Sequence, residues 1–225
     1  MFPICGWLNN DNQPLIVGFA GKARSGKDTA GAYLVDNYQF LRYSFAQPLK
    51  DATKIMFHLT DKQIENKEKP AEPWGRSPRE LYQKVGTDIA RNIDVNVWVK
   101  GADIFRQENP GRSIVITDVR FSNEAFWIRD QGGIVVYLQS ETRGIYENGE
   151  HSSENGMKGD DVDIIIQNDG TINALHEKLE ELKAKFDNIK ILKFDIFQHE
   201  KIEDFINDAT EELGGSLDCI INNAG

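Results

Sequence analysis

The stretch Gly21-Lys-Ala-Arg-Ser-Gly-Lys27 fits the pattern G-x-x-x-x-G-K. It follows an apolar run, residues 14 to 20, and opens a segment of helical character, residues 27 to 37. In this setting glycines let backbone N–H groups wrap around phosphate oxygens, and the helix N-terminus adds partial positive charge. We therefore interpret it as a phosphate-binding loop rather than a glycine-rich turn, with the candidate ligands Gly21, Lys22, Arg24, Ser25, Gly26 and Lys27.

The residue after Lys27 departs from the usual pattern. Serine or threonine is expected there, with its hydroxyl on Mg²⁺, but the chain has Asp28 followed by Thr29. A carboxylate is a hard-oxygen partner for Mg²⁺, directly or through water. An acid in the first turn of a helix is also favoured by the helix dipole alone, so both interpretations stay open at this point.

Outward from the loop, apolar runs alternate with segments of helical periodicity. Strands are expected at 14–20, 40–45, 113–117, 133–138 and 162–167. Helices are expected at 27–37, 47–59, 77–93, 95–107, 123–131 and 171–186, with a polar loop at 58–76. Ser77-Pro-Arg-Glu80 is a capping box with proline at the first helical position. Strands alternating with helices predict an α/β fold with a parallel sheet covered on both faces.

Composition narrows the class of protein. The 225 residues are 40% hydrophobic, enough for one core or for one core plus a small appendage. The net charge of −10 argues against binding along a nucleic-acid backbone. We expect no membrane span, because no apolar run approaches ~20 residues, and no secretory signal. Cys5 and Cys219 are the only cysteines and predict neither a disulfide framework nor a zinc site, which fits a reducing cytoplasm.

A second pair of candidate residues follows the strand expected at 113–117. Asp118 stands at its carboxyl end, where ligands bind in open α/β sheets, and Arg120 comes two residues later. Asp118 could hold Mg²⁺ through water or accept a hydrogen bond from the attacking group, and Arg120 could pair with a phosphate. The alternative is an Asp that caps the next helix and an Arg that neutralises it. The phosphate loop favours the functional interpretation.

The helix expected at 77–93 carries polar side chains at i, i+4 and i+8, namely Arg79, Gln83 and Thr87. An arginine, an amide and a hydroxyl on one face can recognise a phosphate and a base edge, and Gly86 allows close approach. A solvated polar face is the plain alternative. Trp98 is on spacing alone more typical of a core than of a stacking platform.

A polar segment, residues 141 to 158, contains Arg143 and His151. It has the composition of a lid that closes over phosphates, and equally that of an ordinary surface loop.

These residues resemble one family. Gly21-Lys-Ala-Arg-Ser-Gly-Lys-Asp-Thr29 is similar to the phosphate loop of phage deoxynucleoside monophosphate kinases, including the unusual Asp-Thr ending. Order and spacing agree from about residue 15 to residue 186. Each further motif is short, but together they are specific: Gln83-Lys-Val-Gly-Thr-Asp88, Val97-Trp-Val-Lys100, Asp118-Val-Arg120, His151-Ser-Ser-Glu154 and Asn168-Asp-Gly170.

The resemblance implies an adenylate-kinase-like fold and Mg²⁺-dependent transfer of phosphate from ATP to a deoxynucleoside monophosphate. Its partners would be nucleotides, with no nucleic acid and no membrane, and a homodimer is left open. The triphosphate and the metal would be served by Ser25, Lys27, Asp28 and Thr29. The monophosphate would be held by Arg79, Gln83, Gly86, Thr87, Trp98 and Asp118. Arg120 and Glu124 would lie on the donor side, and the catalytic residues would be Lys27, Asp118 and Arg120.

Two features set limits on this resemblance. Glu80 stands where the family tends to carry a second basic residue, which would weaken binding of the acceptor phosphate. The animal-type phosphomevalonate kinases share the Gly-Lys-Asp ending, the Asp-x-Arg and a similar Ser-Glu segment, so they are the second candidate. The Gln-x-x-Gly-Thr helix and Trp98 favour a nucleotide acceptor.

The last part of the chain resembles a different family. Residues 187–225, which include Ile189-Lys-Ile-Leu-Lys-Phe-Asp195 and end with Asn222-Asn-Ala-Gly225, resemble the middle of a short-chain dehydrogenase. An upstream Thr-Gly-x-x-x-Gly-x-Gly loop and a downstream Tyr-x-x-x-Lys, which hydride transfer needs, are both missing. We therefore expect a kinase domain at 1–186 and a truncated β-α-β fragment at 187–225, without NAD(P)-dependent oxidoreductase activity.

Overall fold

The structure, a computed structural model, describes residues 14–141 and 159–187. Five parallel strands form one sheet in the order β2-β3-β1-β4-β5. They are β1 (Ile16–Ala20), β2 (Leu41–Tyr43), β3 (Ile114–Val119), β4 (Ile134–Gln139) and β5 (Ile164–Gln167). β1 is central and wholly buried, with Ile16 opposite Ile114 on one side and Val17 opposite Ile134 on the other. The predicted α/β fold with a parallel sheet is confirmed.

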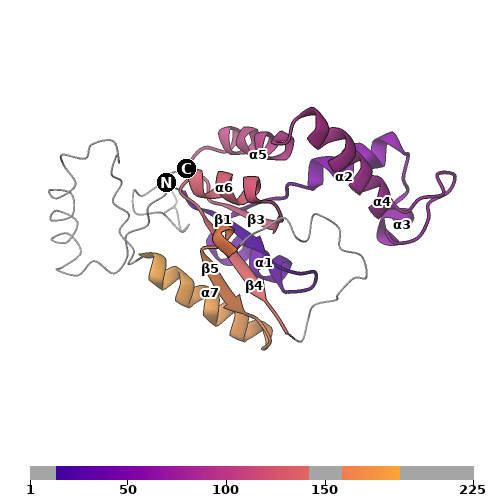
Figure 1. Cartoon of the computed structure of the whole chain (residues 1–225). Helices are drawn as coiled ribbons and strands as arrows, with labels where there is room; N and C mark the ends of the chain where they lie inside the picture. The colour runs from indigo at the N-terminus through magenta and orange to yellow at the C-terminus, as the bar shows by residue number, and fades with distance from the viewer. Residues whose placement is uncertain (1–13, 142–158, 188–225) are drawn as a thin grey trace, which may run out of the picture.

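Alternate residues of β1 belong to two cores, because successive side chains of a strand point to opposite faces. Val17 and Phe19 face α1 (Lys27–Tyr38) and α7 (Ile172–Asp187), whereas Ile16 faces α5 (Val97–Glu108) and α6 (Ser122–Asp130). Figure 1 shows the two helix pairs on opposite sides of the sheet. Helices cover both faces of the sheet, as predicted. The central strands are therefore buried on both sides, which explains why their sequences are continuous apolar runs.

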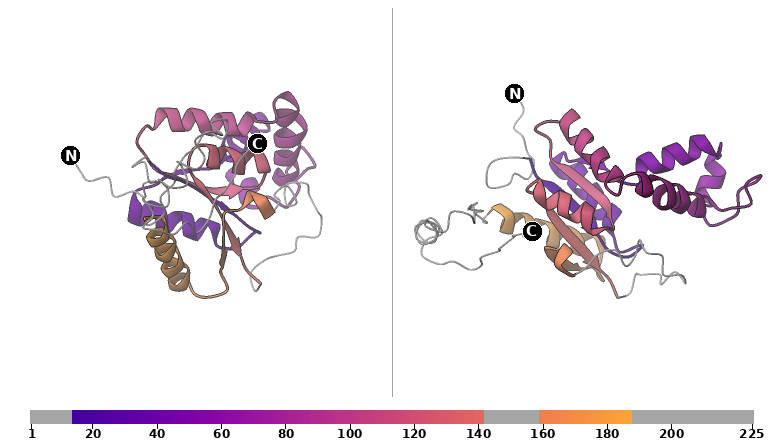
Figure 2. Two further views of the ribbon diagram at one scale, coloured as in Figure 1. Left: turned by 60° about the vertical axis from the view of Figure 1, so that its left-hand side comes forward. Right: turned by 45° about the horizontal axis from the view of Figure 1, so that its top comes forward.

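A group of shorter helices stands out from the sheet, as the right-hand view of Figure 2 shows. It consists of α2 (Gln47–Met56), α3 (Asp61–Glu65), α4 (Pro78–Gln83) and the π-helix η1 (Lys84–Arg91). A small core of Leu59, Ala71 and Leu81 holds it together, and α2 packs against α4 and η1.

Two expectations for this group need correction. The loop expected at 58–76 contains α3, which begins at a capping box in which Thr60 and Gln63 exchange hydrogen bonds. The helix expected at 77–93 begins at Ser77 and extends to Ile93 as predicted, but it changes from α to π winding after Gln83, and the π winding lasts to Arg91. A Cβ at Gly86 would lie 2.5 Å from Leu49 Cδ2, so any other residue here would force the Leu49 side chain of α2 to move.

The remaining short element of the described chain is η2 (Gly159–Asp161), a 3₁₀ turn before β5. Within the described ranges no helix is long and apolar enough to cross a membrane. The lid residues Arg143 and His151, the His151–Glu154 motif and the dehydrogenase-like segment after residue 187 lie outside the described residues.

Candidate active site

The loop between β1 and α1 has the backbone of a phosphate cradle. Gly21 and Gly26 have φ angles of 134° and 102°, which L side chains rarely adopt. Asn168, at the end of β5, donates a buried hydrogen bond of 2.8 Å from its side-chain amide to the Ser25 carbonyl. A Cβ at Gly26 would lie 2.4 Å from that same amide nitrogen, so both conformation and space require glycine.

Lys27 opens α1 and folds back over this loop. Its Nζ donates to the carbonyl oxygens of Gly21 (2.7 Å) and Lys22 (2.6 Å). The pKa of Lys27 is lowered to about 8, mainly by burial and also by Arg120, while Asp28 and Asp118 oppose the shift. The ammonium therefore stays charged at neutral pH, and Arg120 and Asp118 lie close enough to form one charge cluster with the loop.

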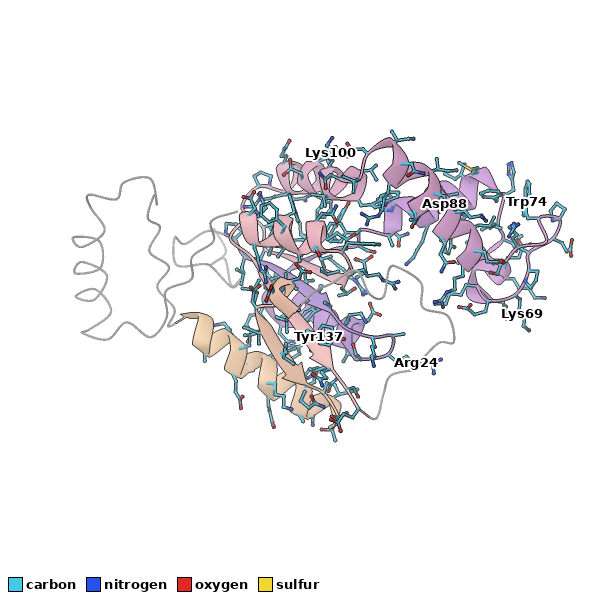
Figure 3. All side chains as sticks on the ribbon, viewed as in Figure 1. Arg24, Lys69, Trp74, Asp88, Lys100 and Tyr137 are labelled. Carbon is cyan, nitrogen blue, oxygen red and sulfur yellow. The ribbon has the colours of Figure 1, made fainter. Side chains whose placement is uncertain are left out.

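Other loop residues offer donors of their own. The Ser25 hydroxyl is buried and has no hydrogen-bond partner in the part of the chain described. Arg24 lies exposed at the tip of the loop (Figure 3), and Thr29 is half-buried in the first turn of α1. The positive-φ glycines, the Lys27 ammonium and the Ser25 hydroxyl together give the loop the backbone and the donors that fit a bound polyphosphate.

Asp28 is exposed beside the loop and has two polar neighbours. The Thr117 hydroxyl donates to its carboxylate (3.1 Å), and Arg42 from β2 bonds to both Asp28 and Thr117. The carboxylate and the hydroxyl are hard-oxygen ligands of the kind that Mg²⁺ prefers. The described residues contain no cluster of three or more His, Cys, Asp or Glu side chains that could hold a metal. A divalent cation at Asp28 would therefore take its remaining ligands from phosphate oxygens and water.

Asp118 has a different environment. Its carboxylate accepts hydrogen bonds from the Ser44 hydroxyl (2.6 Å) and from the backbone N–H groups of Phe45 (3.0 Å) and Ala46 (2.9 Å). These bonds tie the end of β3 to the turn that leads into α2. Most of the lone pairs that a metal ion would use are already engaged.

A cavity of about 410 Å³ lies between the short helices and the carboxyl ends of β1 and β3. It reaches Ala23 of the phosphate loop, so the loop and the cavity form one continuous site. All the residues expected to hold the acceptor line it, together with Arg120 and Glu124: Arg79, Gln83, Gly86, Thr87, Trp98 and Asp118. Residues that were not singled out from the sequence also line it: Phe45, Ala46, Leu49, Lys50, Ile64, Lys67, Tyr82, Arg91 and Phe121.

The cavity wall is positively charged on balance. Arg79 pairs with Glu68 (3.2 Å) outside the cavity, and Arg91 pairs with Glu124 (2.7 Å) within it. Lys50, Lys67 and Arg120 contribute cations as well. The rest of the wall is largely apolar or aromatic and includes Trp98, which also packs against one of the sheet's two cores. Such a wall fits a ligand with an anionic group and a flat apolar group.

Glu80 does not line this cavity. Its carboxylate accepts hydrogen bonds from the Ser77 backbone N–H (2.8 Å) and from the Ser77 hydroxyl (3.2 Å), which lowers the pKa of Glu80. The acid at this position therefore caps α4, and this contact accounts for its presence where a base was expected.

Glu124 lines the 410 Å³ cavity beside Arg120, and its place on the donor side stays a prediction. It is 2% exposed, and its Oε2 accepts the backbone N–H groups of Arg120 (2.8 Å) and Phe121 (3.2 Å). Burial raises the pKa of Glu124 to about 7, against the effect of these donors and of the Arg91 guanidinium. Arg91 was missed in the sequence, although it continues the series Arg79, Gln83 and Thr87 by four more residues.

Comparisons with known proteins agree with this geometry. The sequence model of the deoxynucleotide monophosphate kinase family matches residues 15–76 and 57–179. A protein of Acanthamoeba polyphaga mimivirus that carries the name deoxynucleotide monophosphate kinase is 34% identical over 183 residues, covering 73% of this chain and 94% of the relative. The deoxynucleotide monophosphate kinase of Enterobacteria phage T4 is 24% identical over 234 residues, covering 73% and 96%.

Two further comparisons concern the tail and the fold. The model of the short chain dehydrogenase family matches residues 153–225 and so overlaps the first match at residues 153–179. Among solved structures, shikimate kinase from Aquifex aeolicus is 15% identical with a TM-score of 0.39, covering 76% of this chain and 98% of that one. A likeness at this score says nothing about the substrate.

Proposed function

Because the chain belongs to the deoxynucleotide monophosphate kinase family, we propose that it transfers the γ-phosphate of ATP to a deoxynucleoside monophosphate held in the 410 Å³ cavity. One observation carries this assignment: the phosphate loop opens directly into a cavity whose wall combines cations with aromatic side chains. A donor on the loop and an acceptor in the cavity would then meet near Ala23 and Arg120.

The loop holds the donor. When a triphosphate binds, Lys27 Nζ exchanges its contacts with the Gly21 and Lys22 carbonyls for phosphate oxygens. The acceptor's phosphate oxygen attacks the γ-phosphorus, the bond to the β–γ bridging oxygen breaks, and ADP leaves. Lys27 and Arg120 offset the charge that develops, which is the main task of the protein in phosphoryl transfer.

The helix face formed by α4 and η1 holds the acceptor. Arg79 meets its phosphate, and Gln83 and Thr87 offer an amide and a hydroxyl to the base and sugar. Trp98 supplies an apolar surface beside them. The acceptor is thereby fixed in one orientation, which converts a bimolecular reaction into an effectively unimolecular one.

Mg²⁺ is the metal that we assign to this site, with Asp28 as the protein group that holds it. The ion supplies charge neutralisation at the phosphate oxygens when it is bound. Asp118 acts instead by fixing the Ser44–Ala46 turn, and with it the start of α2, because its carboxylate is engaged there.

A coupled assay tests the function. The full chain is incubated with ATP and Mg²⁺ and, in turn, with each of the four common deoxynucleoside monophosphates and with phosphomevalonate, and formation of ADP is followed. We expect turnover with one or more of the nucleotides and none with phosphomevalonate. The reverse preference would assign the chain to the second candidate activity, a phosphomevalonate-type kinase.

We propose that residues 1–186 form the kinase domain and that residues 187–225 add no second activity. α7 belongs to the kinase core, since Leu175, Leu179 and Leu182 are buried against α1 and the sheet. Residues 187–225 contain no Tyr-x-x-x-Lys, the pair of side chains that hydride transfer needs.

A further inference from the structure

The ion pair between Arg91 and Glu124 lies in the wall of the cavity and is nearly excluded from solvent. Arg91 Nη2 is 2.7 Å from Glu124 Oε1, and the two side chains are 11% and 3% exposed. Replacing a buried ion pair by well-packed apolar residues is often neutral or stabilising. Stability alone therefore does not explain the presence of this pair.

Glu124 connects the pair to the backbone of the turn that carries Arg120. Its second oxygen accepts the N–H groups of Arg120 and Phe121. The Arg91 guanidinium carbon also lies 3.8 Å from the centroid of the Phe121 ring. Arg91 therefore holds this turn in two ways, through the Glu124 carboxylate and through the Phe121 ring.

The same arginine belongs to the acceptor side. It lies in η1, one turn after Thr87, and its Nη1 donates to the Val95 carbonyl (3.2 Å) at the start of the next segment. π-helical turns are frequent at functional sites. Both Thr87 and Arg91, which belong to this element, line the cavity. Arg91 thus joins the helix that we expect to hold the acceptor to the turn that presents Arg120.

We propose that Arg91 is a positioning residue for phosphoryl transfer. Through Glu124 and Phe121 it fixes the backbone at Arg120, so that the Arg120 guanidinium meets the transferring phosphate. Arg120 itself has no hydrogen-bond or ion-pair partner for its guanidinium in the described part of the chain, so its place depends on the turn. This inference rests on the proposed kinase activity and deepens it.

The test compares Arg91→Lys in two backgrounds. Lysine keeps the charge but loses the planar fork and the stacking surface. In the otherwise wild-type chain we expect kcat to fall about tenfold or more. The reason is that a small misplacement of a group at the reacting phosphate slows the reaction strongly. The Kd for the deoxynucleoside monophosphate, measured by calorimetry without ATP, should change by less than about threefold. In the Arg120→Ala background, Arg91→Lys should lower kcat by no more than about twofold.

The control is Arg129→Lys. Arg129 forms a partly buried ion pair with Asp163 (2.8 Å) away from the cavity, so kcat should stay at the wild-type value. If Arg91→Lys does not fold, Glu124→Gln decides by the same comparison, because glutamine keeps an oxygen for the two backbone N–H groups. If Arg91→Lys lowers kcat by the same factor in the Arg120→Ala background as in the wild-type chain, the two residues act independently. That result would overturn this inference and leave the proposed function standing. A wild-type chain without kinase activity would overturn the proposed function and this inference together.

Discussion

The Ser44 hydroxyl donates a hydrogen bond of 2.6 Å to the carboxylate of Asp118, across 74 positions of the sequence. Together with the N–H groups of Phe45 and Ala46, it fixes the turn that starts α2 to the end of β3. The wall of the acceptor cavity on the α2 side therefore depends on Asp118.

Asp118→Asn should weaken binding of the acceptor nucleotide. The amide cannot accept all three hydrogen bonds with one oxygen, so the turn loosens, and hydrogen bonds to a charged group are worth about 1.5–3 kcal/mol. We expect KM for the deoxynucleoside monophosphate to rise about tenfold or more. Ser44→Ala removes one bond of the three and should have a smaller effect in the same direction. A shifted Mg²⁺ midpoint with an unchanged acceptor KM would show that Asp118 serves the metal instead.

Asp28→Asn should weaken binding of Mg²⁺. Removing the charge of the carboxylate that we assign to Mg²⁺ weakens binding of the ion, so the Mg²⁺ concentration at half-maximal rate should rise several-fold, with the acceptor KM nearly unchanged. Asp36→Asn, at an exposed position on the same helix, is the matched control. If the midpoint stays at the wild-type value, Asp28 is only an acid favoured by the helix N-terminus.

Glu124 should make stability depend on pH. Its pKa is raised from 4.5 to about 7, mainly by burial, with Arg91 and Asp118 as the charged side chains that face it. Between these pH values the folded chain binds more protons than the unfolded chain, so the contribution of Glu124 to the free energy of unfolding decreases as pH rises. Urea unfolding should show that the free energy of unfolding of the wild type is lower at pH 8 than at pH 5. The difference should be smaller in Glu124→Gln. Glu108→Gln, at an exposed glutamate, should keep the wild-type pH dependence.

The tail should be dispensable for the kinase. The last buried leucine of α7 is Leu182, so a chain that ends at Phe186 keeps every core contact of the described residues. We expect its kcat and KM values to match those of the whole chain, and the whole chain to oxidise no alcohol with NAD⁺ or NADP⁺. Loss of kinase activity on removing residues 187–225 would place the domain boundary elsewhere.

Sequence reasoning found the features that are local. The phosphate loop, the capping box at Ser77 and the alternation of strands and helices each depend on residues a few positions apart, and the structure has all three. The polar face of Arg79, Gln83 and Thr87 was also foreseen, because helical spacing alone places them together.

The site contacts that could not be predicted from the sequence join segments that are far apart along the chain. Arg42 meets Asp28 and Thr117 from another strand, and Arg91 meets Glu124 across 33 positions. Periodicity also cannot separate α from π winding over eight residues, so the change after Gln83 was not foreseen. Such side-chain partners become visible only once the sheet order brings the segments together.

The most direct test of the proposed function measures transfer of labelled phosphate from ATP to the nucleotide, with Lys27 intact and with Lys27 replaced by alanine. The full chain is supplied with ATP carrying a radioactive γ-phosphate and with a deoxynucleoside monophosphate that the wild type accepts, and the labelled diphosphate is counted. Lys27→Ala should lower turnover by ~10²-fold or more, because a preorganised charge at the transferring phosphate is lost. Lys69→Ala, at an exposed lysine in the segment between α3 and α4 (Figure 3), should match the wild type. Near-normal turnover in Lys27→Ala would contradict the assignment of the phosphate loop.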